Sequence, residues 1–277
     1  MKISKSKLLS FITCPQKYLL SYELGIRPKK RAGEILIGQS THHAITTILE
    51  KRLKGEAFEF EDLIEVMNDF WMHVDSENSD FDSEEEIRKA IAQSLDLVRL
   101  FLKETEDLSP QEVEYEFTLP VVNIRTGEEL NGVELTGRID LIDEVDGRKR
   151  AIEIKTRARR SDGFSAALSL ELTVYAYWIR FLSDKDTVPV SYINIVKNRK
   201  PYLQFQNQER STEDFVELFH TIKAVCENIV DGRFYKNPGV HCNWCDYRSI
   251  CIKDRDAVED RFGTEALDLI QDVLWVK

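Results

Sequence analysis

The chain has 277 residues, of which 42% are hydrophobic and 31% are charged, and its formal net charge at pH 7 is -11. This length and composition allow one large domain with a core of its own and exclude a small scaffold held by disulfides. No apolar run reaches the roughly 18 residues of a membrane span, and the N-terminus does not resemble a signal peptide. We therefore expect a cytoplasmic protein without a membrane partner.

The charges are unevenly distributed along the chain. Taken alone, the negative net charge disfavours non-specific binding to nucleic acid. Residues 148–160, however, contain seven basic side chains and one acid. A cluster of this kind suits a polyanionic ligand such as a nucleic acid.

The first 110 residues are predicted to be mostly helical. Apolar residues recur at helical spacing over 4–26, 38–55, 60–74 and 83–106. The first of these patterns is interrupted at Cys14-Pro15. Because proline favours the first turn of a helix, Cys14 is expected just before a helix start.

The pattern changes to strands after residue 110. Residues 112–122, 133–145 and 149–157 alternate or run apolar, and Asp146-Gly147 predicts a hairpin between the last two. A helix is expected over 164–182, followed by strands over 188–197 and 201–206. A helix over 211–232, a cysteine-rich loop and a short helix over 264–274 complete the chain. We expect a single domain, 1–277, with a core (111–207) between a helical region (1–110) and a C-terminal region (208–277).

Two neighbouring predicted strands carry a set of acidic and basic side chains. Asp140 lies on the first, and Glu153 and Lys155 project from one face of the second because they are two residues apart. Ile152 and Ile154 point to the other face, where they can fill the core. Across the hairpin, Asp140 can lie beside Glu153, and two adjacent carboxylates repel unless a cation lies between them. Oxygen ligands suit Mg²⁺ or Mn²⁺, and a lysine beside the metal can activate water.

Five motifs, in order along the chain, resemble those of the PD-(D/E)XK nuclease superfamily and, within it, of the RecB-like nucleases. They are "SKLLSFITCPQKYLLSY" (6–22), "GQSTH" (38–42), "GRID" (137–140), "EIKT" (153–156) and "ELTVY" (171–175). The resemblance implies an α/β, restriction-endonuclease-like fold. In such a fold a mixed β-sheet core is flanked by helices.

The resemblance also implies a Mg²⁺- or Mn²⁺-dependent deoxyribonuclease. Its metal ligands would be His42, Asp140, Glu153 and the carbonyl of Ile154, and its catalytic residues Asp140, Glu153, Lys155 and Tyr175. Contacts to the DNA backbone would come from Tyr175, Arg157, Arg159, Arg160 and the position of Glu171. The family has glutamine at this last position, and a carboxylate cannot donate the hydrogen bonds of an amide.

Several residues have alternative interpretations. Glu114 and Glu116 alternate on one face of the first strand, where they are either solvent-exposed or a helpful acid near the metal. The aromatic side chains of Tyr177, Trp178 and Trp244 could stack on bases, but core packing is the expected role of each.

Three of the five cysteines, Cys242, Cys245 and Cys251, form a C-x2-C-x5-C pattern typical of a metal site. Candidates for the fourth ligand are His241, Cys226 and Cys14. Four cysteines suit either zinc or an iron–sulfur cluster. The resemblance to RecB-like nucleases, with one distal N-terminal cysteine, implies a [4Fe–4S] cluster on Cys14, Cys242, Cys245 and Cys251.

Such nucleases include subunits of break-resection complexes and nucleases of CRISPR adaptation. The resemblance therefore implies an exonuclease on single-stranded DNA or DNA ends in recombination, repair, phage DNA processing or CRISPR adaptation. The chain lacks a G-x-x-x-x-G-K-[ST] motif, so a helicase partner would be a separate chain, as would CRISPR-adaptation proteins. The alternative is a non-catalytic, metal-stapled DNA-binding or scaffold subunit.

Overall fold

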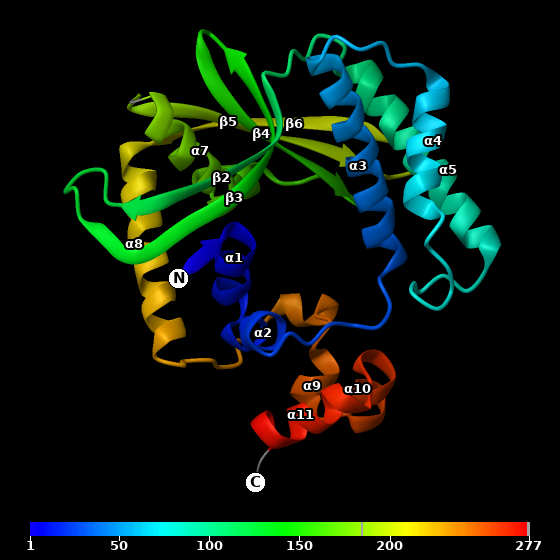
Figure 1. Cartoon of the computed structure of the whole chain (residues 1–277), viewed down its shortest axis with the longest axis vertical. Helices are drawn as coiled ribbons and strands as arrows, with labels where there is room; N and C mark the ends of the chain where they lie inside the picture. The colour runs from blue at the N-terminus through cyan, green and yellow to red at the C-terminus, as the bar shows by residue number, and fades with distance from the viewer. Residues whose placement is uncertain (184, 276–277) are drawn as a thin grey trace.

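A computed structural model describes residues 1–183 and 185–275 of the chain. Its centre is a mixed sheet of six strands in the order β1-β3-β4-β5-β6, with β2 also paired to β3 (Figure 1). The pairs β1–β3 and β4–β5 are parallel, and the other pairs are antiparallel. The strands are β1 (Lys2–Ser4), β2 (Glu112–Val122), β3 (Glu129–Val145), β4 (Arg148–Arg157), β5 (Thr187–Val196) and β6 (Tyr202–Ser211).

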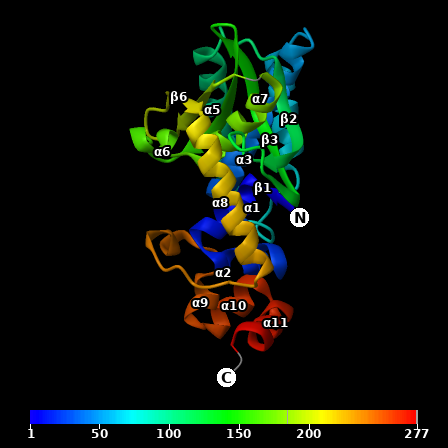
Figure 2. The same ribbon diagram turned by 90° about the vertical axis from the view of Figure 1, so that its left-hand side faces the viewer.

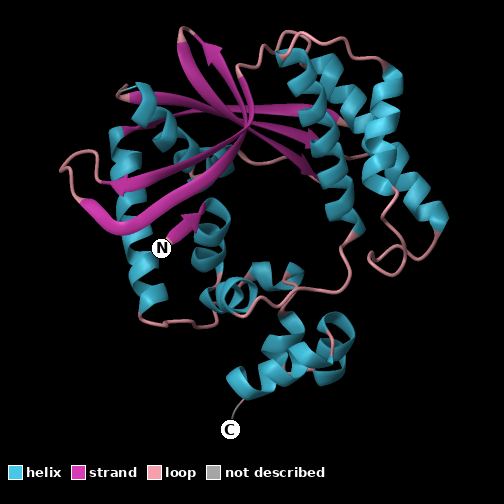
Figure 3. Cartoon of the chain, viewed as in Figure 1, coloured by secondary structure: helices cyan, strands magenta, loops and turns pink. Residues whose placement is uncertain are grey.

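Helices flank this sheet and form the C-terminal end of the molecule (Figure 3). They are α1 (Lys5–Thr13), α2 (Pro15–Tyr18), α3 (Gly33–Leu53), α4 (Phe60–Trp71), α5 (Glu84–Glu104), α6 (Gly163–Ala167), α7 (Leu170–Ser183), α8 (Thr212–Val230), α9 (Arg248–Ile252), α10 (Arg255–Phe262) and α11 (Thr264–Leu274). A π-helical turn spans Leu19–Glu23 and a 3₁₀ turn spans Val240–Trp244. The predicted fold class, a mixed sheet flanked by helices, is confirmed.

Two hydrophobic cores lie on opposite faces of the sheet. One is shared with α3, α4 and α5 and contains Ile152 and Ile154 of β4. The other is shared with α1, α7 and α8 and contains Ala151. The alternation of side chains along β4 therefore places its isoleucines in one core, as predicted, and directs Glu153 to the opposite face.

Strand β3 changes partners partway along its length. On one side it pairs with β1 at residues 134–136 and with β4 at residues 141–145. Among the described residues, no strand pairs with 137–140 on that side. Extending the β3–β4 register by one residue places Asp140 opposite Glu153. The GRID motif thus occupies a fork in the sheet.

The two ends of the chain pack against each other. A third hydrophobic cluster joins Leu20 and Ile26 to Tyr247 and Ile250, together with residues of α10 and α11. The amide of Gln16 also donates to the carbonyl of Tyr235 over 3.0 Å. Figure 2 shows α2 directly above the C-terminal helices. Sequence separation is therefore no obstacle to a site shared by both ends.

The structure differs from the predicted elements in several places. Helix α3 begins at Gly33 rather than residue 38, and the helix predicted over 164–182 is two helices, since Ser169 caps the amide of Leu172 over 3.1 Å. Strand β1 and helix α10 were not predicted, because short elements carry little periodicity. Residues 276–277 of the predicted C-terminal region lie outside the described residues. No helix in the described ranges has the length and apolarity to cross a membrane.

Candidate active site

Asp140 stands at the fork between β3 and β4 and is 6% exposed. Its Oδ2 accepts a hydrogen bond from the amide of Ile154 over 2.8 Å and lies 3.8 Å from His42 Nδ1. The other ring nitrogen, Nε2, is 2.8 Å from Glu114 Oε1. Single ligand atoms of His42, Glu114 and Asp140 all lie within 4.8 Å of one another, a spacing that one divalent cation could bridge. We call these three residues the acidic trio.

Glu114 reaches this trio from an unusual backbone conformation. Its φ of 51° is in the left-handed region, which few residues other than glycine adopt. Strain of this kind is concentrated at functional sites. Arg138 Nε holds the second carboxylate oxygen at 2.6 Å. Of the two acids that the sequence left open, Glu114 joins His42 and Asp140. Glu116 lies opposite Arg138 in the register of β2 and β3 and is not part of this group.

Glu153 is not part of the acidic trio, although it was expected to share a metal with Asp140 and His42. Its buried carboxylate is bonded to two ammonium groups, those of Lys5 (2.9 Å) and Lys155, and to the hydroxyl of Tyr175. It still lies near enough to Asp140 to raise the pKa of that carboxyl. The expected set of Asp140, Glu153 and Lys155 is therefore brought together, with Glu153 held by cations.

Tyr175 and Glu171 occupy positions that differ from the expected contacts with DNA. Tyr175 is fully buried, and its hydroxyl donates to Glu153. Glu171 is 7% exposed and accepts hydrogen bonds from Lys155 over 3.0 Å and from the hydroxyl of Tyr192 over 2.9 Å. Both side chains project inward from α7 and so organise the site from beneath rather than face a substrate.

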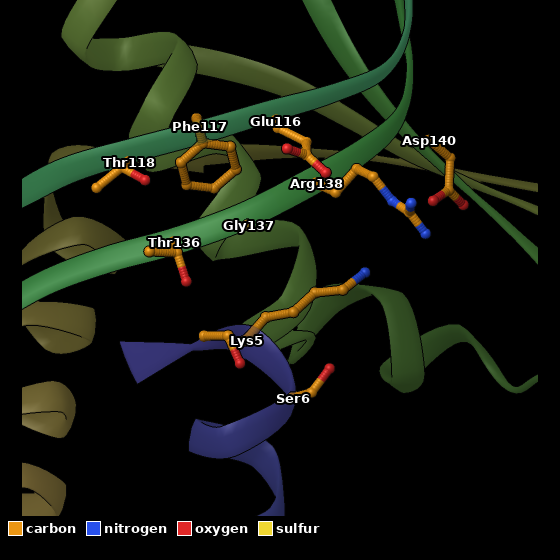
Figure 4. A pocket seen from close by; sticks show the side chains of 10 residues that line it. Lys5, Ser6, Glu116, Phe117, Thr118, Thr136, Gly137, Arg138 and Asp140 are labelled. Carbon is orange, nitrogen blue, oxygen red and sulfur yellow. The ribbon is translucent and has the colours of Figure 1, made fainter. Parts of the chain in front are cut away.

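Lys5 is the site residue that the sequence did not reveal. It is the first residue of α1, and its ammonium contacts Glu153, Glu171 (2.8 Å) and the hydroxyl of Tyr175. Figure 4 shows it extending from α1 toward Arg138 and Asp140, which with Lys5 line a cavity of about 510 Å³. The only signal for Lys5 in the sequence is its place directly before the N-terminal motif (6–22) that contains Cys14.

The local charges shift the ionisation of several groups. Burial, reinforced by the charge of Glu153, raises the pKa of Asp140 to about 7. Burial acts against the charge of Glu171 as well, but the ammonium groups of Lys155 and Lys5 prevail and lower the pKa of Glu171 to about 2. The pKa of Lys155 is raised, because Glu153 and Glu171 outweigh the effect of its burial. Lys155 and Glu171 are thus both charged, while Asp140 has a high affinity for a cation or a proton.

Basic residues lie at the end of β4 and in the loop that follows it. Arg157 is half-buried and donates from Nε to Asn194 Oδ1 over 2.6 Å. Arg159 and Arg160 are exposed in the loop that follows β4. Because a chain extends at most about 3.6 Å per residue, Arg160 lies within about 18 Å of Lys155.

The cysteines occupy the junction of the chain ends. Cys14 follows α1, Cys242 lies in the 3₁₀ turn, and Cys251 lies in α9; all five cysteines of the chain are free thiols. Burial raises the pKa of the Cys245 and Cys251 thiols, and the nearby thiols of Cys14 and Cys242 raise it further. In the described chain, no three sulfur atoms lie within 4.8 Å of one another.

The structure also shows where other residues with alternative interpretations lie. Cys226 is buried in the core under α8. Tyr177 and Trp178 are 1% and 6% exposed, as predicted for core residues. The core interpretation of Trp244 was wrong, because this side chain is 80% exposed beside the cysteines. Trp244 ends a five-residue 3₁₀ turn, which has too few neighbours to bury it.

The fold and the site place the chain among enzymes that carry an acidic cluster and a lysine at the divergence of two strands. The family model of the PD-(D/E)XK nuclease superfamily matches residues 2–252, and the chain belongs to this superfamily. No curated protein matches the sequence.

Two solved structures are similar to the chain. A suspected exonuclease from Eubacterium rectale has a TM-score of 0.55 and 12% identity, over 91% of this chain and 87% of that one, which shows a shared fold. The protein SSO0001 has a TM-score of 0.32 and 15% identity, over 86% of this chain and 93% of that one, a likeness too low to bear on the fold.

Proposed function

We propose that the protein is a Mg²⁺- or Mn²⁺-dependent deoxyribonuclease that hydrolyses phosphodiester bonds. One observation carries the proposal: the fork in the sheet brings the acidic trio beside Glu153 and Lys155 in a chain of the PD-(D/E)XK nuclease superfamily. The whole chain, 1–277, would act as a single nuclease domain. An arrangement of buried carboxylates around a lysine is costly in a protein that uses it only as a scaffold.

The acidic trio suits a hard divalent cation. Asp140 is buried near a second carboxylate, and a cation would relieve their repulsion. His42, Glu114 and Asp140 would hold the ion, with Glu153 and the Ile154 carbonyl as further ligands on its open side. A bound cation of this kind polarises phosphate and lowers the pKa of a coordinated water.

The protein side chains would divide the remaining tasks. Lys155, whose side chain is 33% exposed, would leave the glutamates to orient water and neutralise charge on the phosphate. Tyr175 would fix Glu153 through its hydroxyl. Arg157, Arg159 and Arg160 would bind the DNA backbone, while Glu171 would act indirectly, through the two lysines.

We propose an exonuclease that acts on single strands or DNA ends. The similarity of fold to a suspected exonuclease supports this choice. Roles in recombination, repair, phage DNA processing or CRISPR adaptation fit such an activity, and a helicase or CRISPR-adaptation proteins would be separate partners.

We also propose a [4Fe–4S] cluster on Cys14, Cys242, Cys245 and Cys251, of the kind found in RecB-like nucleases. The C-x2-C-x5-C spacing near the C-terminus and the distal Cys14 follow the cysteine pattern that the resemblance implies for such a cluster. Such a cluster would join the N-terminal helices to α9.

The test is cleavage of end-labelled DNA, single- and double-stranded, with each end labelled in turn. We expect products with Mg²⁺ or Mn²⁺, none with a chelator, and none from Lys155→Ala. Lys7→Ala is a matched control, since Lys7 is a half-buried lysine of α1 whose ammonium donates to the backbone carbonyl of Lys2 rather than to a group of the site. A wild-type protein that cleaves neither substrate with either metal would refute the enzymatic function and favour the scaffold alternative.

A further inference from the structure

Four charged side chains of the candidate active site form a closed ring in which positive and negative groups alternate. They are Lys5, Glu153, Lys155 and Glu171. Lys5 contacts Glu153 and Glu171 at 2.9 and 2.8 Å. Lys155 contacts the same two carboxylates, with 3.0 Å to Glu171. Each glutamate thus has two ammonium partners, and the ring has no net charge.

The two lysines of the ring differ in position. The side chain of Lys5 is 17% exposed and lies over the ring of Tyr175, 4.6 Å from its centroid. The side chain of Lys155 is 33% exposed, and the glutamates are 4% and 9% exposed. Lys155 is therefore the member of the ring that can reach a ligand outside it, whereas Lys5 is enclosed.

The backbone fixes Lys5 in place. Strand β1 pairs in parallel with residues 134–136 of β3, only a few residues before Asp140. Ser4 then caps α1 by accepting from the amide of Lys7 over 3.2 Å. Lys5 follows this cap directly, so its ammonium enters the site from a defined point.

We propose that Lys5 is a positioning residue that releases Lys155 for the substrate. If Lys5 were absent, Glu153 and Glu171 would share Lys155 as their remaining ammonium, and both would retain it. With Lys5 present, each buried carboxylate keeps an ammonium partner when Lys155 turns toward a phosphate. Lys5 also sets the net charge beside the acidic trio, and this part of the inference does not require catalysis. The release of Lys155 rests on the proposed nuclease function.

The decisive experiment is a double-mutant cycle of Lys5→Met and Glu171→Gln. Isothermal calorimetry would measure Mn²⁺ binding to the protein without DNA, and thermal unfolding would be followed without metal. Lys5→Met removes one positive charge near the trio, so we expect about tenfold tighter Mn²⁺ binding. Glu171→Gln removes one negative charge, and binding should weaken about tenfold. The double variant should return to within about threefold of the wild type, with its unfolding temperature partly restored.

Cleavage measurements then test the release of Lys155. We expect Lys5→Met to lower kcat about tenfold with little change in KM, and Glu171→Gln in the same chain to restore most of the loss. Lys5→Arg, which keeps the charge, should bind Mn²⁺ within about threefold of the wild type. Lys7→Met is the control, because Lys7 is a half-buried lysine of the same helix whose ammonium donates to the backbone carbonyl of Lys2 and not to the ring.

The outcomes separate this inference from the proposed function. An unfolding temperature of the double variant that falls by the sum of the two single effects, or unchanged Mn²⁺ affinity in Lys5→Met, would overturn the charge ring. If Lys5→Met does not fold, Glu171→Gln and Lys5→Arg still test the charge argument, and unchanged Mn²⁺ affinity in Glu171→Gln overturns it. Opposite shifts of Mn²⁺ affinity in Lys5→Met and Glu171→Gln, together with a wild type that cleaves no DNA, would refute the nuclease but leave the ring in place.

Discussion

The acidic site at the fork of β3 and β4 and the cysteine junction between the chain ends are held in different ways. In the first, strand register places buried charges, and lysines and glutamates pair with one another. In the second, half-buried thiols lie on or beside a 3₁₀ turn and a five-residue helix, and Ile250 of that helix packs with Leu20. The comparison teaches that the first region is already organised by the fold, while the second would depend on the proposed cluster. Changes in the first should alter chemistry, and changes in the second should alter stability.

The largest effect is expected for Asp140→Asn, which removes a charge from the acidic trio without changing shape. Cleavage should fall at least about 10³-fold, because metal and lysine act as a unit. The metal-free protein should be no less stable, since a buried carboxylate near Glu153 is lost. End-labelled DNA and thermal unfolding measure the two quantities. A large fall in unfolding temperature would contradict the assignment of this site to chemistry.

Cys14→Ala should mainly lower stability, in contrast to Asp140→Asn, which should mainly lower cleavage. We expect loss of the brown colour and broad visible absorption of a cluster, and an unfolding temperature lower by about 10 °C, since bound metal contributes directly to folding. Cys226→Ala is the control, because Cys226 lies in another core and its loss should leave the spectrum intact. An unchanged spectrum in Cys14→Ala would point to His241 as the fourth ligand, or to Cys226 if that control loses the colour. A colourless wild type with stoichiometric zinc would refute the cluster.

A third change tests whether every residue of an active-site motif serves chemistry. Gly137 belongs to the GRID motif, but a Cβ there would lie 2.4 Å from the ring of Phe117. Gly137→Ala should therefore destabilise the fold by about 1–3 kcal/mol. Gly163→Ala is a matched control, because a Cβ at this position meets no atom within 4 Å. Equal unfolding temperatures in the two variants would contradict this packing role.

The sequence predicted strands β2 to β6 and the proximity of Asp140 to Glu153 because both depend on local periodicity and a short hairpin. His42 was placed near Asp140 by resemblance, and the structure brings the two within 3.8 Å. Lys5 could not be predicted, because it reaches Glu153 through a parallel strand of three residues that pairs 132 positions away. Glu114 could not be separated from Glu116 for a similar reason: a backbone φ of 51° reverses the alternation that strands normally follow.

The smallest of these effects is expected for Glu114→Gln, and it tests the boundary of the acidic site. The substitution keeps the size of the side chain but removes one negative charge from the trio, so Mn²⁺ affinity should fall about tenfold. Glu116→Gln is the control two residues away, since Glu116 is exposed and lies outside the trio. Calorimetry without DNA compares both with the wild type. If Glu116→Gln weakens binding as much as Glu114→Gln, long-range charge rather than ligation controls the affinity. If only Glu114→Gln weakens it, the strained residue of β2 belongs to the metal site.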